Sequence, residues 1–235
     1  MTTTFITGAN KGLGKETARQ LIAAGHTVLL GARDENRGMA AAAELGATFI
    51  RIDVTDGASV ARAAERIAGE GGIDVLINNA GVEGRGPGNT ILAPAETTAE
   101  DVRAVFDVNV FGTMRVTHAL LPLLERSAAP VIVNVASGLA SLSMLSDPSG
   151  PTHFYPGIAY PASKAVVNTI TIQLAKALPR FRVNSVEPGF TRTDLNGNTG
   201  TQSVEVGARH IVRMAMVSPD GPTGTFASGH GDLPW

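Results

Sequence analysis

Tyr160 and Lys164 are the pair of side chains in this sequence best suited to moving a proton. Residues four positions apart lie on one face of a helix, so the phenol and the ammonium would be neighbours. A free phenol has a pKa near 10, and a nearby positive charge favours its ionised form, which brings that pKa toward neutrality. Pro161 is compatible with the first turn of such a helix, where no amide hydrogen bond is lost. Tyr155, the other tyrosine, is followed four residues later by Ala159 and is the weaker candidate.

A glycine-rich segment, TGANKGLG at residues 7–14, lies between a predicted strand and a predicted helix. Gly8 permits a tight turn, Gly12 lets a pyrophosphate approach the backbone, and Gly14 allows close packing of the helix on the strand. The start of the helix offers free N–H groups and a partial positive charge to an anion. No Lys-Ser or Lys-Thr pair follows the last glycine, so this is not a nucleoside-triphosphate P-loop. Its place after the first strand favours a dinucleotide site over an ordinary turn.

The elements that must position these residues follow from the alternation of short apolar runs with longer alanine-rich stretches. Continuous apolar runs are typical of strands buried on both faces of a parallel sheet. The alternation predicts an α/β fold, a Rossmann-type doubly wound parallel sheet of about seven strands with helices on both faces, in one domain over residues 1–235. We expect strands at 2–7, 27–32, 47–52, 73–78, 130–137 and 181–188, one more near the C-terminus, and helices at 14–24, 34–45, 57–69, 99–120, 160–178 and 203–216. Asp34, Asp56 and the pair Thr97-Thr98 are expected to cap helices.

Composition excludes several classes of function. The 235 residues carry a net charge of −2, so no overall basic field favours nucleic acid or an anionic membrane. No apolar run approaches the roughly 18 residues of a membrane span, and no secretory signal is visible, so we expect a soluble cytoplasmic protein. The absence of cysteine excludes disulfides and thiolate metal sites. The histidines show no metal-ligand spacing, so we expect no metal site and interpret them as surface or helix residues, of which only His153, in the segment before Tyr160, could touch a substrate.

Three segments rich in Gly, Pro, Ser and Thr interrupt the alternation, at residues 82–98, 138–158 and 189–203. Each follows directly after a predicted strand. Ligands of open α/β sheets bind outside the carboxyl ends of the strands. Ordinary surface loops are the alternative interpretation, but the length and common edge of these segments favour the mouth of a substrate pocket.

The spacing of Gly8, Gly12 and Gly14 resembles the TGxxxGxG fingerprint of the short-chain dehydrogenase/reductase family rather than the GxGxxG of other dinucleotide-binding proteins. The resemblance covers residues 2 to about 194, and it is greatest to the carbonyl-reductase-like members. Further motifs of that family follow in its order: Asp53-Val54, NNAG at 78–81, Asn109 within FDVNVFG, Ser137 within VNVAS, YPASK at 160–164, and PGFTRT at 188–193.

This resemblance implies a catalytic group of Asn109, Ser137, Tyr160 and Lys164. Tyr160 would act as acid and base, Ser137 would orient the substrate oxygen, and Lys164 would also hold the nicotinamide ribose. Asn109 would interrupt its helix and hold a water in a relay to Lys164. The alternative for Asn109 is a helix-bending core residue, and both roles are compatible.

The end of the second predicted strand indicates which dinucleotide binds. Family members that use NAD place an acid there, and here the position is occupied by Ala32, followed by Arg33. Lys11 is a second cation in the family's other position for reading a 2′-phosphate. Two cations without an acid favour NADP(H), although both could be plain surface charges, and Arg33 could lie against the adenine. Asp34 is more suitable as a helix cap than as a ribose ligand.

The resemblance also implies where the remainder of the cofactor lies. Asp53 and Val54 would contact the adenine, and Asn79 and Gly81 would pack beside its ribose and support the central sheet. The backbone near Phe190 and the hydroxyl of Thr191 would hold the nicotinamide carboxamide. The expected cofactor residues are Gly8, Asn10, Lys11, Gly12, Leu13, Gly14, Arg33, Asp53, Val54, Asn79, Ala80, Gly81, Asn109, Tyr160, Lys164, Pro188, Gly189, Phe190, Thr191 and Thr193.

These features predict an NADP(H)-dependent oxidoreductase that reversibly reduces a small carbonyl compound to an alcohol. An NAD-dependent alcohol or sugar dehydrogenase and a non-catalytic dinucleotide-sensing regulator are the alternatives. A sensor is expected to lack Ser137, Tyr160 or Lys164, and all three are present. The helices at 99–120 and 160–178 are apolar on more than one face, which, with the family's habit of pairing them, favours a homodimer or homotetramer.

Overall fold

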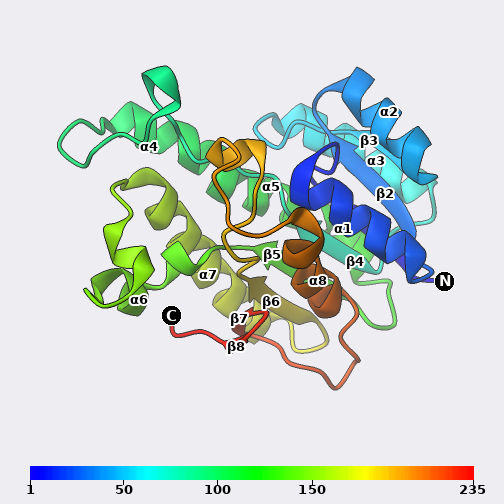
Figure 1. Cartoon of the computed structure of the whole chain (residues 1–235). Helices are drawn as coiled ribbons and strands as arrows, with labels where there is room; N and C mark the ends of the chain where they lie inside the picture. The colour runs from blue at the N-terminus through cyan, green and yellow to red at the C-terminus, as the bar shows by residue number, and fades with distance from the viewer.

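The computed structural model describes residues 1–235, which form an eight-stranded sheet with helices on both faces (Figure 1). The strand order is β3-β2-β1-β4-β5-β6-β7-β8. Strands β1 to β7 are parallel, and β8 is antiparallel to β7. The strands are β1 (Thr3–Ile6), β2 (Thr27–Ala32), β3 (Thr48–Arg51), β4 (Val75–Asn78), β5 (Val131–Val135), β6 (Arg182–Val186), β7 (Phe226–Ser228) and β8 (Gly231–Asp232). The predicted doubly wound sheet is confirmed, and the short β8 extends the expected count by one.

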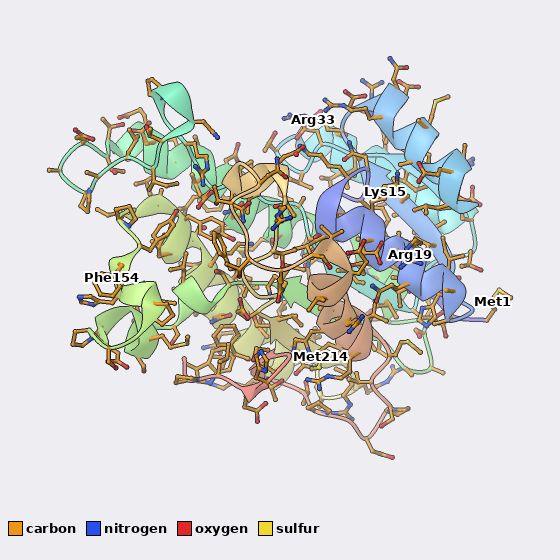
Figure 2. The ribbon with its side chains drawn as sticks, in the orientation of Figure 1. Met1, Lys15, Arg19, Arg33, Phe154 and Met214 are labelled. Atoms are coloured by element: carbon orange, nitrogen blue, oxygen red, sulfur yellow. The ribbon has the colours of Figure 1, made fainter.

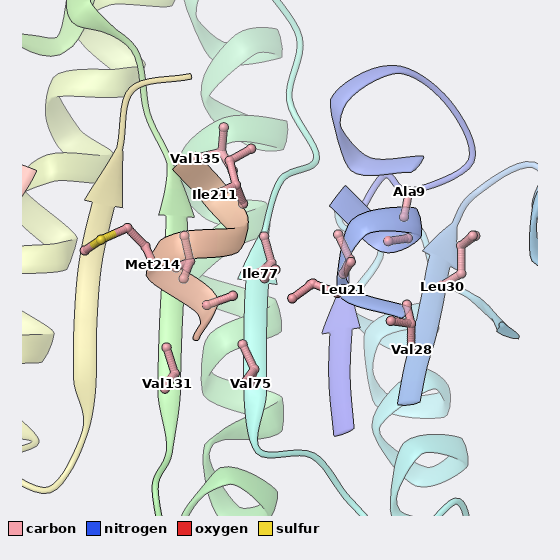
Figure 3. Packing of buried hydrophobic residues seen from close by; sticks show 14 of the residues in the cluster. Ala9, Leu21, Val28, Leu30, Val75, Ile77, Val131, Val135, Ile211 and Met214 are labelled. Atoms are coloured by element: carbon pink, nitrogen blue, oxygen red, sulfur yellow. The ribbon is translucent and has the colours of Figure 1, made fainter. Parts of the chain in front are cut away.

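The helices are α1 (Gly12–Ala23), α2 (Glu35–Leu45), α3 (Gly57–Gly69), α4 (Ala99–Phe106), α5 (Thr113–Leu124), α6 (Leu142–Ser146), α7 (Ala159–Ala177) and α8 (Val204–Ala215). Two buried clusters hold them to the sheet. One joins α1, α2 and α8 to one face, and the other joins α3 and α5 to the opposite face. Figure 3 shows the first cluster, in which Ile211 and Met214 of α8 lie over Val131 and Val135 of β5. Burial of these side chains holds the helices in place on the two faces of the sheet.

Three helices begin at the caps expected from the sequence. The side chains of Asp34, Asp56 and Thr98 accept hydrogen bonds from amides in the first turns of α2, α3 and α4. Thr98 and Asp101 form a reciprocal capping box. Asp34 is therefore used as a cap, as the sequence indicated.

The helix predicted at 99–120 is divided and ends later than expected. A π-helical turn, η2 (Asp107–Gly112), separates α4 from α5, and α5 extends to Leu124. Asn109 lies inside this turn and is buried. π-turns are often found at functional sites, and the expected interruption of the helix at Asn109 is present.

The segments at 82–98, 138–158 and 189–203 contain only short elements. They hold η1 (Pro87–Asn89), then η3 (Gly138–Ala140), α6 and η4 (Pro151–Phe154), then η5 (Asp194–Asn196). All three leave carboxyl ends of strands, as the sequence predicted. Within the chain, no helix combines the length and apolar character needed to cross a membrane.

Candidate active site

A cleft of about 1620 Å³ lies at the carboxyl ends of the parallel strands. Arg33 and Phe154 both line it and lie on opposite sides of the molecule in Figure 2, so the cleft crosses much of this edge. The three segments at 82–98, 138–158 and 189–203, hereafter the mouth segments, each contribute residues to its wall. Of the residues expected in catalysis or cofactor binding, all except Asn109 line this one cleft.

The glycine loop has the shape of a cradle. Gly8 and Gly12 adopt left-handed backbone conformations, with φ of +66° and +53°. A Cβ on Gly14 would lie 2.6 Å from the Gly8 carbonyl oxygen, so only glycine permits this close packing. No side chain caps the start of α1, which leaves its first N–H groups available. A pyrophosphate fits the chemistry of this helix start.

The part of the cleft between the start of α1 and the end of β2 is cationic. Arg33 is exposed and makes no ion pair. Lys11 lies in an ion pair with Asp194, with 2.9 Å between Nζ and Oδ2. Arg37 also lines the cleft and pairs with the Asp34 cap at 2.8 Å. Arg37 and Asp194 were missed from the sequence, because only the fold brings Asp194 to Lys11 and the charge of Arg37 near Asp194.

Asp53 and Val54 lie just beyond the end of β3, on the wall of the cleft. The Asp53 carboxylate accepts hydrogen bonds from the backbone and hydroxyl of Thr55, at 3.0 and 2.7 Å. Burial opposes its ionisation, but Thr55 and the charge of Arg33 outweigh burial and lower the pKa of Asp53. A hydrogen-bond acceptor and an apolar side chain are therefore adjacent, as the adenine contact requires.

The NNAG segment, residues 78–81, forms hydrogen bonds with the glycine loop. The Asn79 side chain donates to the carbonyl oxygens of Thr7 and Gly8, at 2.8 and 3.2 Å. The amide of Ala80 donates to the Thr7 hydroxyl at 3.0 Å. Gly81 lies close to Asn109 and Lys164. A Cβ added at Gly81 would lie 3.3 Å from the Asn109 Oδ1 and 3.5 Å from the Lys164 Nζ. The segment thus holds the glycine loop at the end of β1, and its place beside a cofactor ribose stays a prediction.

Tyr160 and Lys164 share one face of α7, and both are buried. The Lys164 Nζ lies 5.6 Å from the centroid of the Tyr160 ring. The same amine donates a 2.7 Å hydrogen bond to the carbonyl oxygen of Val135, at the end of β5. Burial lowers the pKa of Lys164 to about 8.

The pKa of the Tyr160 phenol is raised rather than lowered. Burial is the main cause, the negative charge of Glu83 adds to it, and hydrogen bonding with Ser137 acts in the opposite direction. The expected lowering by Lys164 is not found in this structure, because burial and the charges of Glu83 and Glu187 raise this pKa and the Lys164 amine donates to Val135. A positive charge added beside Tyr160 would lower the pKa.

Ser137 follows β5 and precedes the short η3 turn. Its hydroxyl accepts from the amide of Leu139 at 3.3 Å, and its hydrogen bonding lowers the pKa of Tyr160. Ser141 and Ser143 instead contact the carbonyl oxygen of Trp235. Ser137 is therefore the serine placed to share a substrate oxygen with Tyr160.

The Asn109 side chain forms hydrogen bonds with the Val82 backbone and the Ser163 hydroxyl. Its amide nitrogen donates to the Val82 carbonyl oxygen and the Ser163 hydroxyl, both at 2.9 Å, and its Oδ1 accepts from the Val82 amide at 2.8 Å. It makes no direct hydrogen bond to Lys164, although both approach Gly81. The helix-bending role is present, and the water relay stays a prediction.

The segment after β6 is held mainly by its own side chains. The Thr191 hydroxyl donates to the Gly189 carbonyl oxygen at 3.0 Å and accepts from the Gln202 amide at 2.9 Å. Gln202 also donates to the Pro188 carbonyl oxygen. The sequence assigned this hydroxyl to the cofactor, whereas here it is buried and used within the segment. Thr191 nevertheless lines the cleft together with Pro188, Gly189, Phe190 and Thr193, and its contact with a cofactor stays a prediction.

Three further residues of the cleft were missed from the sequence, and His153, which could have touched a substrate, lies outside it. Glu83 and Glu187 line the part of the cleft near Tyr160. Glu187 directly follows β6 and could have been noticed as an acid at a strand end, whereas Glu83 lies five residues beyond the end of β4. His230, from the β7–β8 connection, lines the cleft. His153 does not, because its ring bonds to the Leu145 carbonyl oxygen.

Comparison with known proteins identifies relatives over nearly the whole chain. A family model described as short chain dehydrogenase matches residues 2–203. The (+)-neomenthol dehydrogenase of Arabidopsis thaliana is 35% identical, and the alignment covers 95% of this chain and 94% of that protein. The salutaridine reductase of Papaver bracteatum is 31% identical, with 94% of this chain and 92% of that protein covered.

Solved structures share the same fold. The structure of salutaridine reductase from Papaver somniferum superposes with a TM-score of 0.83 at 30% identity, covering 96% of this chain and 99% of that chain. An NADPH-bound carbonyl reductase from chicken fatty liver gives 0.85 at 23% identity, covering 99% and 98%. At that identity the second comparison supports the fold alone.

Proposed function

This chain belongs to the short-chain dehydrogenase family and is an oxidoreductase acting on CH–OH and C=O groups; from this premise we propose that it is an NADP(H)-dependent reductase of small carbonyl compounds, with Tyr160 as its acid and base. One observation carries the proposal. The phenol of Tyr160, the amine of Lys164 and the hydroxyl of Ser137 lie in the same cleft as an uncapped, glycine-lined helix start. A dinucleotide and a substrate therefore have adjoining places.

The residues on the dinucleotide side fit a nicotinamide dinucleotide with a 2′-phosphate. The start of α1 would hold the pyrophosphate, while Arg33 and Lys11 would hold the phosphate on the ribose. Asp53 and Val54 would contact the adenine. When bound, such a cofactor supplies the hydride that is exchanged with the carbonyl carbon.

The chain's own residues handle the proton and the oxygen. Ser137 donates a hydrogen bond to the substrate oxygen and stabilises the charge that grows on it. Tyr160 donates its phenolic proton to that oxygen during reduction and accepts it back during oxidation. Lys164, with a pKa of about 8, is poised to exchange a proton near neutral pH.

The test is an assay of NADPH oxidation with a panel of aldehydes and ketones, in which the decrease of NADPH absorbance is measured. We expect turnover with at least one small carbonyl compound, faster with NADPH than with NADH at equal concentration. Tight NADPH binding without turnover across a broad panel would favour a dinucleotide sensor instead. Equal use of both cofactors would favour the NAD-type alternative.

A further inference from the structure

A small polar network joins the three mouth segments on the substrate side of the cleft. Glu83 is its centre, and its side chain is only 8% exposed. One carboxylate oxygen accepts from the Tyr155 hydroxyl at 3.1 Å. The other accepts from the Arg85 guanidinium at 2.8 Å, and Arg85 also donates to the Leu195 carbonyl oxygen at 3.2 Å. Tyr155, Glu83 and Leu195 come from different mouth segments. Glu83 and Arg85 therefore connect the segment at 82–98 to the other two mouth segments.

Tyr155 is thereby fixed as a wall beside the proton donor. Its ring lies 6.5 Å from that of Tyr160, centroid to centroid, and it lines the cleft. Gly157 packs against it so closely that a Cβ there would lie 2.9 Å from the Tyr155 ring. The hydroxyl points to Glu83, so Tyr155 presents its ring rather than its hydroxyl to this part of the cleft.

We propose that Glu83 is a positioning residue of the active site, which fastens the three mouth segments through Arg85 and Tyr155 and holds the Tyr155 ring as the wall of the substrate pocket. This rests on the proposed function for its effect on turnover, but the fastening itself is a property of the free protein. Nearly complete burial and the use of both carboxylate oxygens distinguish Glu83 from an exposed surface ion pair.

The same placement gives Glu83 an electrostatic effect on the proton donor. The charged and titratable groups around the Tyr160 phenol are Glu83 after β4, Glu187 after β6, Lys164 on α7, and Tyr155 in the preceding segment. Glu83 raises the pKa of Tyr160, so removing its charge lowers that pKa. Arg85, left without its partner, would act in the same direction.

Amide hydrogen exchange of the free protein tests the fastening. We expect Glu83→Ala to increase exchange at least threefold in both 151–158 and 194–196, because the contacts to Tyr155 and Arg85 are lost together. Tyr155→Phe should increase it in 151–158 alone. Glu70→Gln is the matched control, since it removes a carboxylate from the Arg66 ion pair, outside the cleft. Unchanged exchange in both segments of Glu83→Ala would overturn the proposal.

Turnover then tests the consequence for the site. Glu83→Gln keeps an oxygen that can accept from Tyr155 but removes the charge, so the midpoint of the pH dependence of kcat for alcohol oxidation should fall by about 0.5 unit or more. Tyr155→Phe should raise KM for the carbonyl about fivefold with NADPH affinity unchanged. An unmoved pH midpoint with an unmoved KM would reject the positioning role. If the wild type turned over no carbonyl compound while the exchange result held, the proposed function would fail and the fastening would stand.

Discussion

Lys11 and Asp194 form an ion pair across the dinucleotide side of the cleft, linking the start of α1 to the segment that follows β6. The two side chains are 56% and 63% exposed, so the pair contributes little to stability. Its importance lies in position, because Lys11 is one of the two cations proposed for the 2′-phosphate. A bound phosphate must share Lys11 with the Asp194 carboxylate, whereas Arg33 has no such competitor.

Arg33 is therefore expected to dominate cofactor choice. NADPH should bind at least tenfold more tightly than NADH, a difference of about 1.4 kcal/mol. Arg33→Asp should move the preference toward NADH, because it removes a cation and provides an acceptor for the ribose hydroxyl. Fluorescence titration of both cofactors at one moderate salt concentration measures this. Equal affinities in the wild type would contradict it.

The competition for Lys11 gives a second prediction. Asp194→Asn should increase affinity for NADPH about twofold to threefold at low salt and leave affinity for NADH unchanged, because only a 2′-phosphate would use the released charge. Lys11→Ala should reduce affinity for NADPH and spare NADH. The same titrations at two salt concentrations are the measurement. A gain for both cofactors would place Asp194 near a group that they share.

Assembly is a third prediction. Phe111 and Met114, three residues apart where η2 meets α5, are 45% and 52% exposed. These exposed apolar side chains, together with the apolar character of the helices at 99–120 and 160–178, favour a homodimer or homotetramer formed through those helices. Light scattering at micromolar concentration should give a multiple of the 24.3 kDa mass of one chain. Met114→Glu should weaken assembly, and Met39→Glu, at an equally exposed position on α2, should not. A wild-type monomer would refute this.

The features predicted from the sequence are those determined by local chemistry. The Asp34 cap needs only an acid before a helix, and the glycine cradle needs only a short run after a strand, so both could be recognised directly. The contact of Tyr155 with Glu83 spans 72 positions, and that of Lys11 with Asp194 spans 183. Periodicity carries no information on such pairs. They depend on how the mouth segments fold over the sheet edge.

The raised pKa of Tyr160 escaped prediction for a similar reason. The spacing to Lys164 indicated a cation beside the phenol, and the cation is present. Its effect depends on burial and on carboxylates brought in from other strands, which the four-residue spacing cannot show.

Burial of Lys164 should be visible in the stability of the free protein. Its pKa is about 8 when folded and has its ordinary value of 10.5 when unfolded, so below pH 8 folding buries a charged amine. Between these values the unfolded state binds the extra proton, so stability should rise with pH by up to about 1.4 kcal/mol per unit relative to Lys164→Met. Urea unfolding of both proteins at pH 7, 8 and 9.5 measures the difference. A difference that does not vary with pH would exclude a depressed pKa.

Tyr160→Phe is the most direct test of the proposed chemistry. The substitution removes one oxygen from a buried ring and keeps the packing of α7, so folding and NADPH affinity should change little. The substrate oxygen would lose its proton donor, and turnover should fall by about 10² or more, the scale of general acid catalysis. Ser137→Ala should mainly lower kcat, since its hydrogen bond strengthens as charge develops on the oxygen, and Lys164→Ala should lower both turnover and cofactor affinity. Tyr155→Phe is the matched comparison for kcat at saturating carbonyl, where its expected effect on KM does not enter, because it removes the other phenolic oxygen of the chain from a ring 6.5 Å away. Near-normal turnover in Tyr160→Phe together with a large loss in Tyr155→Phe would transfer the proton-donor role to Tyr155, even though its hydroxyl is engaged by Glu83.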